Sequence, residues 1–308
     1  MRVLITGVSG FVGSHLSRRL LSENWKILGV ALQEPEESDI EFLQGDLLKL
    51  DLDKIVGDFK PDVVFHLAAQ SHVGQSWEMV ELTHDNNFRS TLRLLEALAK
   101  NKFKPVFVLT SSAEIYGFVD EKKQPIRETQ APAPVSHYGL SKLNCENLAL
   151  FYWRVYGIKT IIVRLFNQIG PGQRPDFVAS YFAKRIAEIE KGLTKPVLEV
   201  GNLEARRDFT DIRDSVEAFY LLVQKGKPGQ IYNLGSGRVY KIKEILEILL
   251  SYSEKDIEVI VKKARMRKKD ISLLWASVEK LNSRTGWVPS IPIEKTLLDV
   301  LNYWRERV

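Results

Sequence analysis

Val3-Leu4-Ile5-Thr6-Gly7-Val8-Ser9-Gly10-Phe11-Val12-Gly13 joins an apolar run to glycines spaced three residues apart, and a helical pattern opens at His15. Small residues at this spacing let the backbone approach a pyrophosphate, whose charge is met by backbone amides and by the positive end of the helix dipole. Strand, turn and helix come in the required order, which favours a dinucleotide site over a simple strand-to-helix turn. The residues predicted to form this site are Gly7, Gly10, Phe11, Val12 and Gly13.

Strand-like and helix-like segments alternate from residue 2 to about residue 145. Continuous apolar strands between amphipathic helices are typical of a parallel sheet that is covered on both faces. The pattern therefore predicts an α/β fold with a doubly wound, Rossmann-type parallel sheet. Its predicted elements are Val3–Thr6, a helix near 11–23, Ile27–Val30, Ile40–Gly45, Val63–Ala68, a helix near 82–101 and Val106–Thr110.

The length of 308 residues allows a second, smaller part of the chain. The run Gly170-Pro171-Gly172-Gln173-Arg174-Pro175 breaks the alternation and marks an exit from the sheet. We expect residues 1–167 to form a dinucleotide-binding domain, to which the chain returns at about 207–235. Residues 168–206 and 236–308 are expected to form a smaller C-terminal α+β lobe that binds the substrate.

Composition excludes several classes of protein. Hydrophobic residues make up 44% of the chain and charged residues 27%, as in ordinary globular proteins. No apolar run reaches the roughly 18 residues that span a bilayer, and the single cysteine, Cys145, cannot form an internal disulfide. No cluster of cysteine and histidine has metal-ligand spacing. We therefore expect a cytoplasmic protein without a metal and without a membrane partner.

The net charge of +5 raises the question of nucleic acid, because phosphate backbones attract basic proteins. Most lysines and arginines alternate with acids along the chain, so we expect no nucleic acid partner. The one dense basic run is Lys262-Lys263-Ala264-Arg265-Met266-Arg267-Lys268-Lys269. Such a run is typical of a solvated surface, and an anionic small substrate is its most economical partner.

Tyr138 and Lys142 stand four residues apart at the start of a predicted helix over 138–156, so both side chains lie on one face. The lysine ammonium favours the phenolate and is predicted to lower the pKa of Tyr138 from about 10 toward neutrality, which makes Tyr138 a general acid or base. Ser111 and Ser112 close the strand 106–110, at the end where ligands collect in parallel sheets. We predict that the Ser112 hydroxyl holds a substrate oxygen beside Tyr138; capping of the following turn is the alternative.

The second strand does not decide between NAD and NADP. It runs Leu28-Gly29-Val30-Ala31-Leu32-Gln33, with no aspartate at its tip for a ribose hydroxyl and no arginine for a 2′-phosphate. Asp46, after the strand 40–45, is placed to accept a hydrogen bond from an adenine amine, although a helix N-cap is an equally plausible use.

Several motifs together resemble the extended short-chain dehydrogenase/reductases that modify nucleotide sugars, and the resemblance covers essentially the whole chain. It implies NAD(P)(H) as the cofactor and extends the cofactor contacts to Asp46, Leu47, Leu67, Ala68, Ala69, Gln70, Tyr138 and Lys142. The motifs are Thr6-Gly7-x-x-Gly10-Phe11-x-Gly13, His66-Leu67-Ala68-Ala69-Gln70, Ser112, Tyr138-x-x-x-Lys142, Arg164-Leu165-Phe166-Asn167, Arg207-Asp208-Phe209-Thr210-Asp211, Tyr232–Gly237 and Thr285–Pro289.

Within that family the sequence is most similar to the GDP-mannose branch. The segment Phe166–Gln173 is similar to the GDP-4-keto-6-deoxy-D-mannose reductases, which make GDP-D-rhamnose. The resemblance implies that Tyr138 protonates the C4 oxygen as hydride arrives from the nicotinamide. Ser112 would hold the same oxygen, and Lys142 would also bind the nicotinamide ribose. The expected partner is a nucleotide-diphosphate sugar, held by Asn167, Arg207 and Arg267.

Other activities remain open. Glu114, two places after Ser112, matches the glutamate that removes the C5 proton in the dehydratases of this family, so a GDP-mannose 4,6-dehydratase is an alternative. A nucleotide-sugar 4-epimerase is another, and a non-catalytic dinucleotide-binding scaffold is a remote one. The segment Leu148–Trp153 is apolar over most of its circumference, which predicts a homodimer through the helices near 82–101 and 138–156.

Overall fold

The computed structural model describes residues 1–101, 104–266 and 270–308. Its centre is a seven-stranded sheet in the order β10-β6-β5-β4-β1-β2-β3, in which every neighbouring pair is parallel. This confirms the predicted doubly wound α/β fold. The order reverses between β1 and β4, and ligands of such sheets bind at this reversal, outside the carboxyl ends of the strands. The strands are β1 (Arg2–Thr6), β2 (Lys26–Ala31), β3 (Glu41–Gln44), β4 (Val63–His66), β5 (Val106–Ser112), β6 (Lys159–Leu165) and β10 (Gln230–Leu234).

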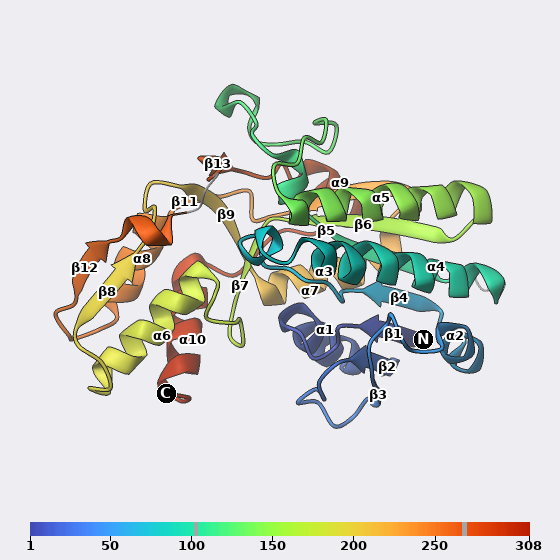
Figure 1. The fold of residues 1–308 in the computed structure, drawn as a ribbon, viewed down its shortest axis with the longest axis horizontal. Coiled ribbons are helices and arrows are strands. Elements are labelled where there is room, and N and C mark those ends of the chain that lie inside the picture. Colours follow the sequence, from blue (N-terminus) through green and yellow to red (C-terminus); the bar gives the residue numbers. More distant parts are fainter. Residues whose placement is uncertain (102–103, 267–269) are drawn as a thin grey trace.

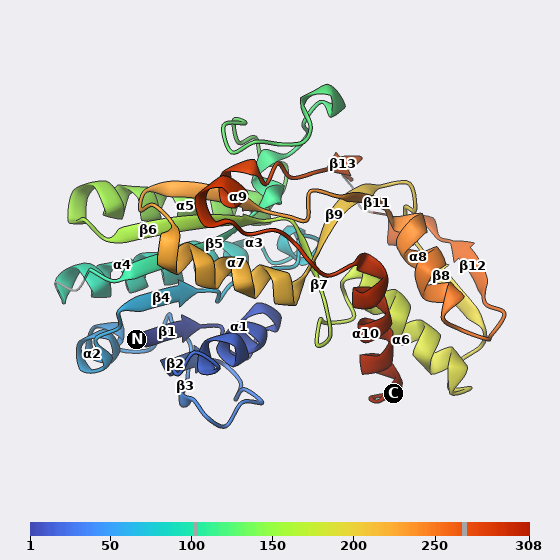
Figure 2. The same cartoon turned by 180° about the vertical axis from the view of Figure 1, so that it is seen from behind.

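Helices cover both faces of this sheet. Figure 1 shows α4 and α5 in front of the strands, and Figure 2 shows α1 and α7 on the opposite face. Two separate hydrophobic clusters fill the layers between helices and sheet. The helices are α2 (Leu52–Phe59), α4 (Ser90–Lys100) and α5 (His137–Tyr156) on one face, and α1 (Phe11–Leu21), α7 (Ile212–Lys225) and α9 (Glu279–Thr285) on the other.

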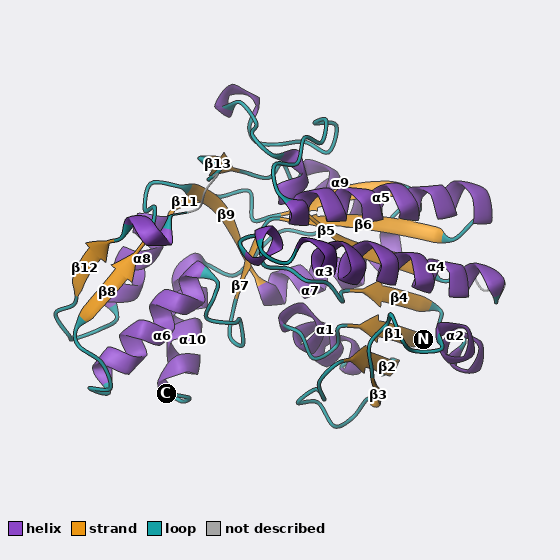
Figure 3. Ribbon diagram, in the orientation of Figure 1, coloured by secondary structure: helices purple, strands orange, loops and turns teal. Residues whose placement is uncertain are grey.

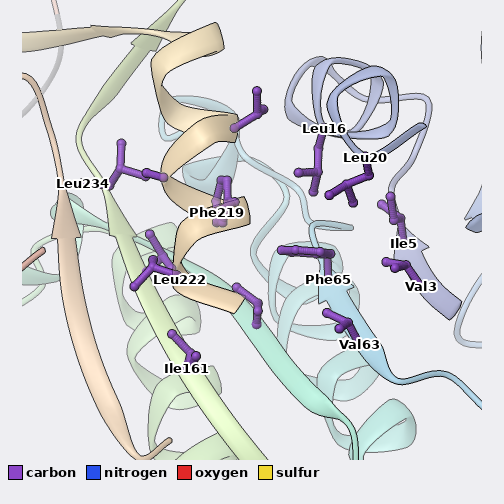
Figure 4. Close-up of a cluster of buried hydrophobic side chains, with 14 of the residues drawn as sticks. Val3, Ile5, Leu16, Leu20, Val63, Phe65, Ile161, Phe219, Leu222 and Leu234 are labelled. Carbon is purple, nitrogen blue, oxygen red and sulfur yellow. The ribbon is translucent and has the colours of Figure 1, made fainter. Parts of the chain in front are cut away.

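The cluster on the α1 and α7 face fixes the start of α1 relative to β1. Leu16 and Leu20 of α1 are fully buried, as are Ile5 of β1 and Phe65 of β4. Figure 4 shows these side chains gathered between the two helices and the strands. Burying a large aliphatic or aromatic side chain contributes roughly 1.5–3 kcal/mol. The glycine turn that links β1 to α1 is therefore held from both ends.

A smaller lobe lies beyond the carboxyl ends of the strands (Figure 3). It mixes strands with helices and has its own hydrophobic cluster. β9 pairs with β7, β11 and β13, and β8 pairs with β12. The elements are β7 (Asn167–Ile169), α6 (Val178–Glu190), β8 (Val197–Val200), β9 (Arg206–Asp211), β11 (Val239–Lys241), α8 (Ile242–Ser251), β12 (Glu258–Val261), β13 (Leu273–Leu274) and α10 (Ile293–Arg305).

Two segments lie elsewhere than the sequence suggested. β9 belongs to the small sheet, so the return to the large sheet consists of α7 and β10. α9, expected in the smaller lobe, packs against α7 and β10 because Leu281 and the nearby Trp287 are buried in the cluster on that face. No helix in the described ranges is long and apolar enough to cross a membrane.

The helix predicted near 82–101 is built of three consecutive pieces. α3 (Val80–His84) passes into a π-helical segment, η2 (Asp85–Arg89), which continues as α4. A π-helical turn widens the helix by one residue and often marks a functional site. Here it turns Asn87 into the interior, where the side chain is 1% exposed.

Candidate active site

The turn after β1 is packed too tightly for side chains at two of its glycines. Gly7 has a φ of +73°, and a Cβ atom there would lie 2.8 Å from the backbone nitrogen of Ala68. A Cβ atom at Gly13 would lie 2.3 Å from the carbonyl oxygen of Gly7. Because both distances are shorter than real Cβ contacts, only glycine fits, and the surface of the turn is backbone.

The N-terminus of α1 opens at this turn. Its N-cap is Gly10, which has no side chain with which to cap the first amides of the helix. The first helical turn, which contains Phe11 and Val12, holds no acidic residue. The first amides of a helix have no partner within the helix, and together with the dipole they attract an anion. The turn therefore fits the pyrophosphate of a dinucleotide.

The segment Leu67-Ala68-Ala69-Gln70, which follows β4, lies against the glycine turn. The backbone nitrogen of Ala68 donates to the hydroxyl of Thr6 at 3.3 Å, and that of Gln70 donates to Asn87 Oδ1 at 2.8 Å. Gln70 Oε1 is buried and has no hydrogen-bond partner. A buried acceptor without a donor is costly, so this oxygen fits a place where a ligand supplies the donor.

Asp46 and Leu47 follow β3 in a turn. The Asp46 carboxylate accepts from the backbone nitrogen of Leu48 at 2.9 Å, whereas the next helix, α2, has Asp51 as its N-cap. The alternative use of Asp46 as a helix N-cap is therefore wrong, because Asp46 stabilises a turn ahead of the helix. Contact with an adenine stays a prediction for both residues.

The loop after β2 is acidic. Residues 32–40 contain no lysine or arginine, and Arg18 of α1 forms ion pairs with both Glu36 and Glu37. One cation is thus shared by two carboxylates, and two further acids lie in the same loop. The end of β2 lies beside the glycine turn, because the backbone nitrogen of Gly7 donates to the carbonyl of Val30 at 2.7 Å. The acids of the loop are Glu34, Glu36, Glu37 and Asp39.

Ser112 and Tyr138 meet where β5 ends and α5 begins. The Ser112 hydroxyl lies close enough to the Tyr138 phenol to act on it through a side-chain hydrogen-bond interaction, which lowers the pKa of Tyr138. The Ser112 oxygen also accepts from the backbone nitrogen of Glu114 at 3.2 Å, so Ser112 caps the following turn as well as contacting Tyr138. The start of α5 is fixed by Ser136, whose hydroxyl accepts from the backbone nitrogen of Gly139 at 3.0 Å.

The pKa values of the predicted acid–base pair differ from the expectation. Burial raises the pKa of Tyr138 above its ordinary value of 10.0; the hydrogen bond with Ser112 opposes this rise, and the Glu114 carboxylate adds to it. Burial also lowers the pKa of the Lys142 ammonium. The prediction that Lys142 brings the Tyr138 pKa toward neutrality is therefore wrong in this structure, because the loss of water around the phenol dominates.

His66 links the end of β1 to α4. Its Nδ1 atom lies 2.7 Å from the Thr6 hydroxyl, and its Nε2 atom lies 2.9 Å from the Thr91 hydroxyl. Burial and, to a smaller extent, the charge of Lys142 lower the pKa of His66 to about 3. A neutral imidazole thus bridges β1 and α4, within electrostatic reach of Lys142.

Sequence reasoning missed Asn87, which connects the two sides of the site. Its Nδ2 atom donates to the Ser141 hydroxyl at 2.9 Å, and Ser141 donates to the carbonyl of Tyr138 at 2.8 Å. Because Asn87 also accepts from Gln70, it holds the first turn of α5 against the segment after β4. The available signal was Asp85-Asn86-Asn87, a polar run inside an otherwise amphipathic helix.

The residues predicted to hold the nucleotide and diphosphate belong to the smaller lobe. Asn167 begins β7, which pairs with the strand that carries Arg207. Arg207 is 5% exposed, and its guanidinium donates to Asp270 at 2.8 Å and to the carbonyl of Arg206 at 2.9 Å. Asn167 and Arg207 are thus on neighbouring strands, while Arg267 lies outside the described residues.

Comparisons with known proteins place the chain among nucleotide-sugar enzymes. Residues 4–300 match the family model described as GDP-mannose 4,6 dehydratase. The GDP-6-deoxy-D-mannose reductase of Pseudomonas aeruginosa is 36% identical over 100% of this chain and 98% of its own length. A solved structure of RMD from P. aeruginosa, complexed with NADPH, has a TM-score of 0.88 and 35% identity, and the match covers 100% of this chain and 99% of that one. The UDP-glucose 4-epimerase of Thermotoga maritima with UDP-glucose has a TM-score of 0.91 and 28% identity, over 99% of each chain.

Substitution of Gly13 tests the dinucleotide site. We expect Gly13→Ala to weaken NADH binding about 100-fold, measured by fluorescence titration, because the added methyl group displaces the Gly7 carbonyl and the turn. Gly192→Ala is the control: unlike Gly13, Gly192 has a positive φ, of +72°, so alanine strains the backbone there, but a Cβ atom meets nothing within 4 Å. Unchanged NADH affinity in a folded Gly13→Ala protein would contradict the assignment of this turn.

The raised pKa of Tyr138 predicts a pH dependence of stability. Because the folded state favours the neutral phenol, its contribution to the free energy of unfolding is complete below the ordinary pKa of 10.0 and is lost as the pH rises above it. The free energy of unfolding in urea, wild type minus Tyr138→Phe, should be constant from pH 7 to 9 and fall above pH 10. A difference that stays constant up to pH 11 is the contrary result.

Proposed function

The chain belongs to the GDP-mannose 4,6 dehydratase family of extended short-chain dehydrogenase/reductases, and we propose that it is a nucleotide-sugar reductase. The reaction is NAD(P)H-dependent reduction of the C4 keto group of GDP-4-keto-6-deoxy-D-mannose to GDP-D-rhamnose. The observation that carries this proposal is the interaction of the Ser112 hydroxyl with the Tyr138 phenol, together with a glycine turn that fits a dinucleotide. The full-length similarity to a GDP-6-deoxy-D-mannose reductase supports the choice of substrate.

Reduction of a carbonyl needs a proton donor and a hydrogen-bond donor at the same oxygen. When bound, a reduced nicotinamide supplies the hydride that C4 receives. Ser112 holds the C4 oxygen, and Tyr138 gives its phenolic proton to that oxygen as negative charge develops on it. The raised pKa suits this direction, because the phenol remains protonated at neutral pH and an alkoxide is a stronger base than a phenolate.

Lys142 has two roles in this proposal. Its ammonium, on the same face of α5 as Tyr138, stabilises the phenolate that remains after proton transfer. It also binds the nicotinamide ribose, which fits its electrostatic effect on His66, the side chain that contacts Thr6 next to the glycine turn. The cofactor contacts proposed around it are Gly7, Gly10, Phe11, Val12, Gly13, Asp46, Leu47, Leu67, Ala68, Ala69 and Gln70.

The nucleotide diphosphate is proposed to bind in the smaller lobe. Asn167 and Arg207 would hold it, with Arg267 of the basic run as a third contact. A guanidinium is suited to a diphosphate because it donates two parallel hydrogen bonds. Arg207 pairs with Asp270, so the substrate phosphate joins or replaces that carboxylate.

One observation favours the dehydratase as the second candidate. Glu114 acts electrostatically on Tyr138, which supports a role for its carboxylate as the base that would remove the C5 proton. The family model bears the dehydratase description. A dehydratase would convert GDP-mannose with no net consumption of the dinucleotide, so the two reactions are separable by assay.

We also propose a homodimer and a cytoplasmic location. Large apolar side chains are exposed along the packed helices α3 and α5, and those at 140, 151 and 155 repeat at helical spacing on one face. Exposed apolar patches of this kind mark association surfaces. The side chains are Leu82, Leu140, Phe151 and Val155.

Replacement of Tyr138 tests the reaction. With GDP-4-keto-6-deoxymannose as substrate, we expect Tyr138→Phe to lower kcat by about 100- to 10,000-fold while NADH still binds, because only the proton donor is lost. Loss of absorbance at 340 nm measures the rate. Parallel incubations with GDP-mannose and with UDP-glucose identify a dehydratase or an epimerase, and conversion of either in place of the keto sugar would refute the reductase.

The acidic loop after β2 predicts a preference for NADH. A 2′-phosphate placed near Glu34 and its neighbours is repelled, so kcat/KM should be about tenfold higher with NADH than with NADPH at low salt. Glu36→Gln combined with Glu37→Gln frees Arg18 and should raise the efficiency with NADPH. Glu247→Gln, in an exposed pair on α8, is the control, and a wild type that prefers NADPH would overturn this prediction.

A further inference from the structure

We propose that Arg164 is the positioning residue that keeps the Ser112 and Tyr138 side chains together, by holding the segment after β5 and the helix α5 through one guanidinium. The motif Arg164-Leu165-Phe166-Asn167 stands out in the sequence, yet the reaction described above gives its arginine no role. Arg164 is 3% exposed and lies in β6, directly across from Ser111 on one side and Asn233 on the other.

One side of the Arg164 guanidinium binds α5. Its Nε atom donates to Glu146 Oε1 at 3.0 Å, and its Nη2 atom donates to Glu146 Oε2 at 2.7 Å. Glu146 is 1% exposed and lies one helical turn after Lys142 and two turns after Tyr138. A bidentate pair fixes rotation as well as distance, so it sets the face that α5 turns toward β5.

The remaining nitrogen of the guanidinium binds the segment after β5. Arg164 Nη1 lies 2.9 Å from the Tyr116 hydroxyl, which donates to Asn233 Oδ1 at 2.7 Å. Tyr116 is fully buried and ends the short helix η3 (Ala113–Tyr116), of which Ser112 is the N-cap. The same guanidinium therefore restrains the turn that begins at Ser112.

A buried ion pair is weak evidence for stability, so packing alone does not explain why this network is present. Replacing a buried ion pair by apolar residues of similar volume is often neutral or stabilising. Here the pair is fully buried and completed by Tyr116 and Asn233, and Nδ2 of Asn233 in turn donates to the carbonyl of Ile126 at 2.8 Å. What the network adds is geometry, and a displacement of about 1 Å at reacting groups costs about 100-fold in rate.

The test uses two variants that leave no unpaired buried charge. Glu146→Gln with Arg164→Met removes both charges together, and Tyr116→Phe keeps the ion pair but removes the hydroxyl that links it to η3 and to Asn233. The matched control is Glu190→Gln with Arg305→Met, because Arg305 also binds Glu190 in a bidentate pair, at 2.7 Å for both bonds, but joins α6 to α10 away from the site.

Two readouts separate positioning from simple stabilisation. The first, which rests on the proposed reductase function, is kcat together with the primary deuterium isotope effect on kcat, using NADH deuterated at the transferred position. We expect kcat to fall about 100-fold in Glu146→Gln/Arg164→Met and about tenfold in Tyr116→Phe, with a larger isotope effect and an unchanged Kd for NADH. A role in folding alone would lower the active fraction and leave the isotope effect at the wild-type value.

The second readout is independent of the substrate. Crystal structures of the wild type and the variants give the separation between the Tyr138 and Ser112 oxygens, which we expect to be longer than in the wild type in Glu146→Gln/Arg164→Met and unchanged in the Arg305 control. If that separation is unchanged in the folded variant, Arg164 does not position the site. If the wild type reduces no keto sugar, the reductase proposal fails, and the crystallographic comparison still decides the role of Arg164.

Discussion

The parallel alignment of β1, β4 and β5 is the constraint on which the site depends. In a parallel sheet all the strands deliver their next residues to the same edge. The glycine turn, the segment 67–70 and Ser112 therefore meet there although they are far apart in the sequence. The backbone contacts at Gly7 and Gly13 are so close that these positions admit no side chain, and helix α5 completes the group by bringing Tyr138 to Ser112.

Buried polar side chains connect these segments through directional hydrogen bonds. Apolar packing alone would define the relative positions of the segments less well. Asn87 joins the segment after β4 to the start of α5, His66 joins β1 to α4, and Arg164 joins β6 to α5 and to the turn after Ser112. Burial is also what sets the acid–base properties: it raises the pKa of Tyr138 and lowers that of Lys142. A site enclosed in this way keeps its phenol protonated and ready to donate.

The sequence was sufficient to predict the family and the large sheet, because local sequence patterns indicate both. Glycine spacing, apolar strands and the interval between Tyr138 and Lys142 can each be read without knowing distant contacts. The pKa of Tyr138 was predicted in the wrong direction because it depends on how completely the folded chain excludes water. The roles of Asn87 and Glu146 were missed for a related reason, since their partners come from segments remote in the sequence, and the placement of α9 depended on Leu281 and Trp287 finding the core of the large sheet.

The central claim is that hydride and proton reach the same sugar carbonyl, the hydride from the dinucleotide at the glycine turn and the proton from Tyr138. It is tested most directly by following the transferred atom. With reduced dinucleotide deuterated at its transferable position and GDP-4-keto-6-deoxymannose as substrate, mass spectrometry and NMR of the product should find one deuterium, bonded to C4 of the hexose. A product without deuterium, or with deuterium at another carbon, would contradict the account.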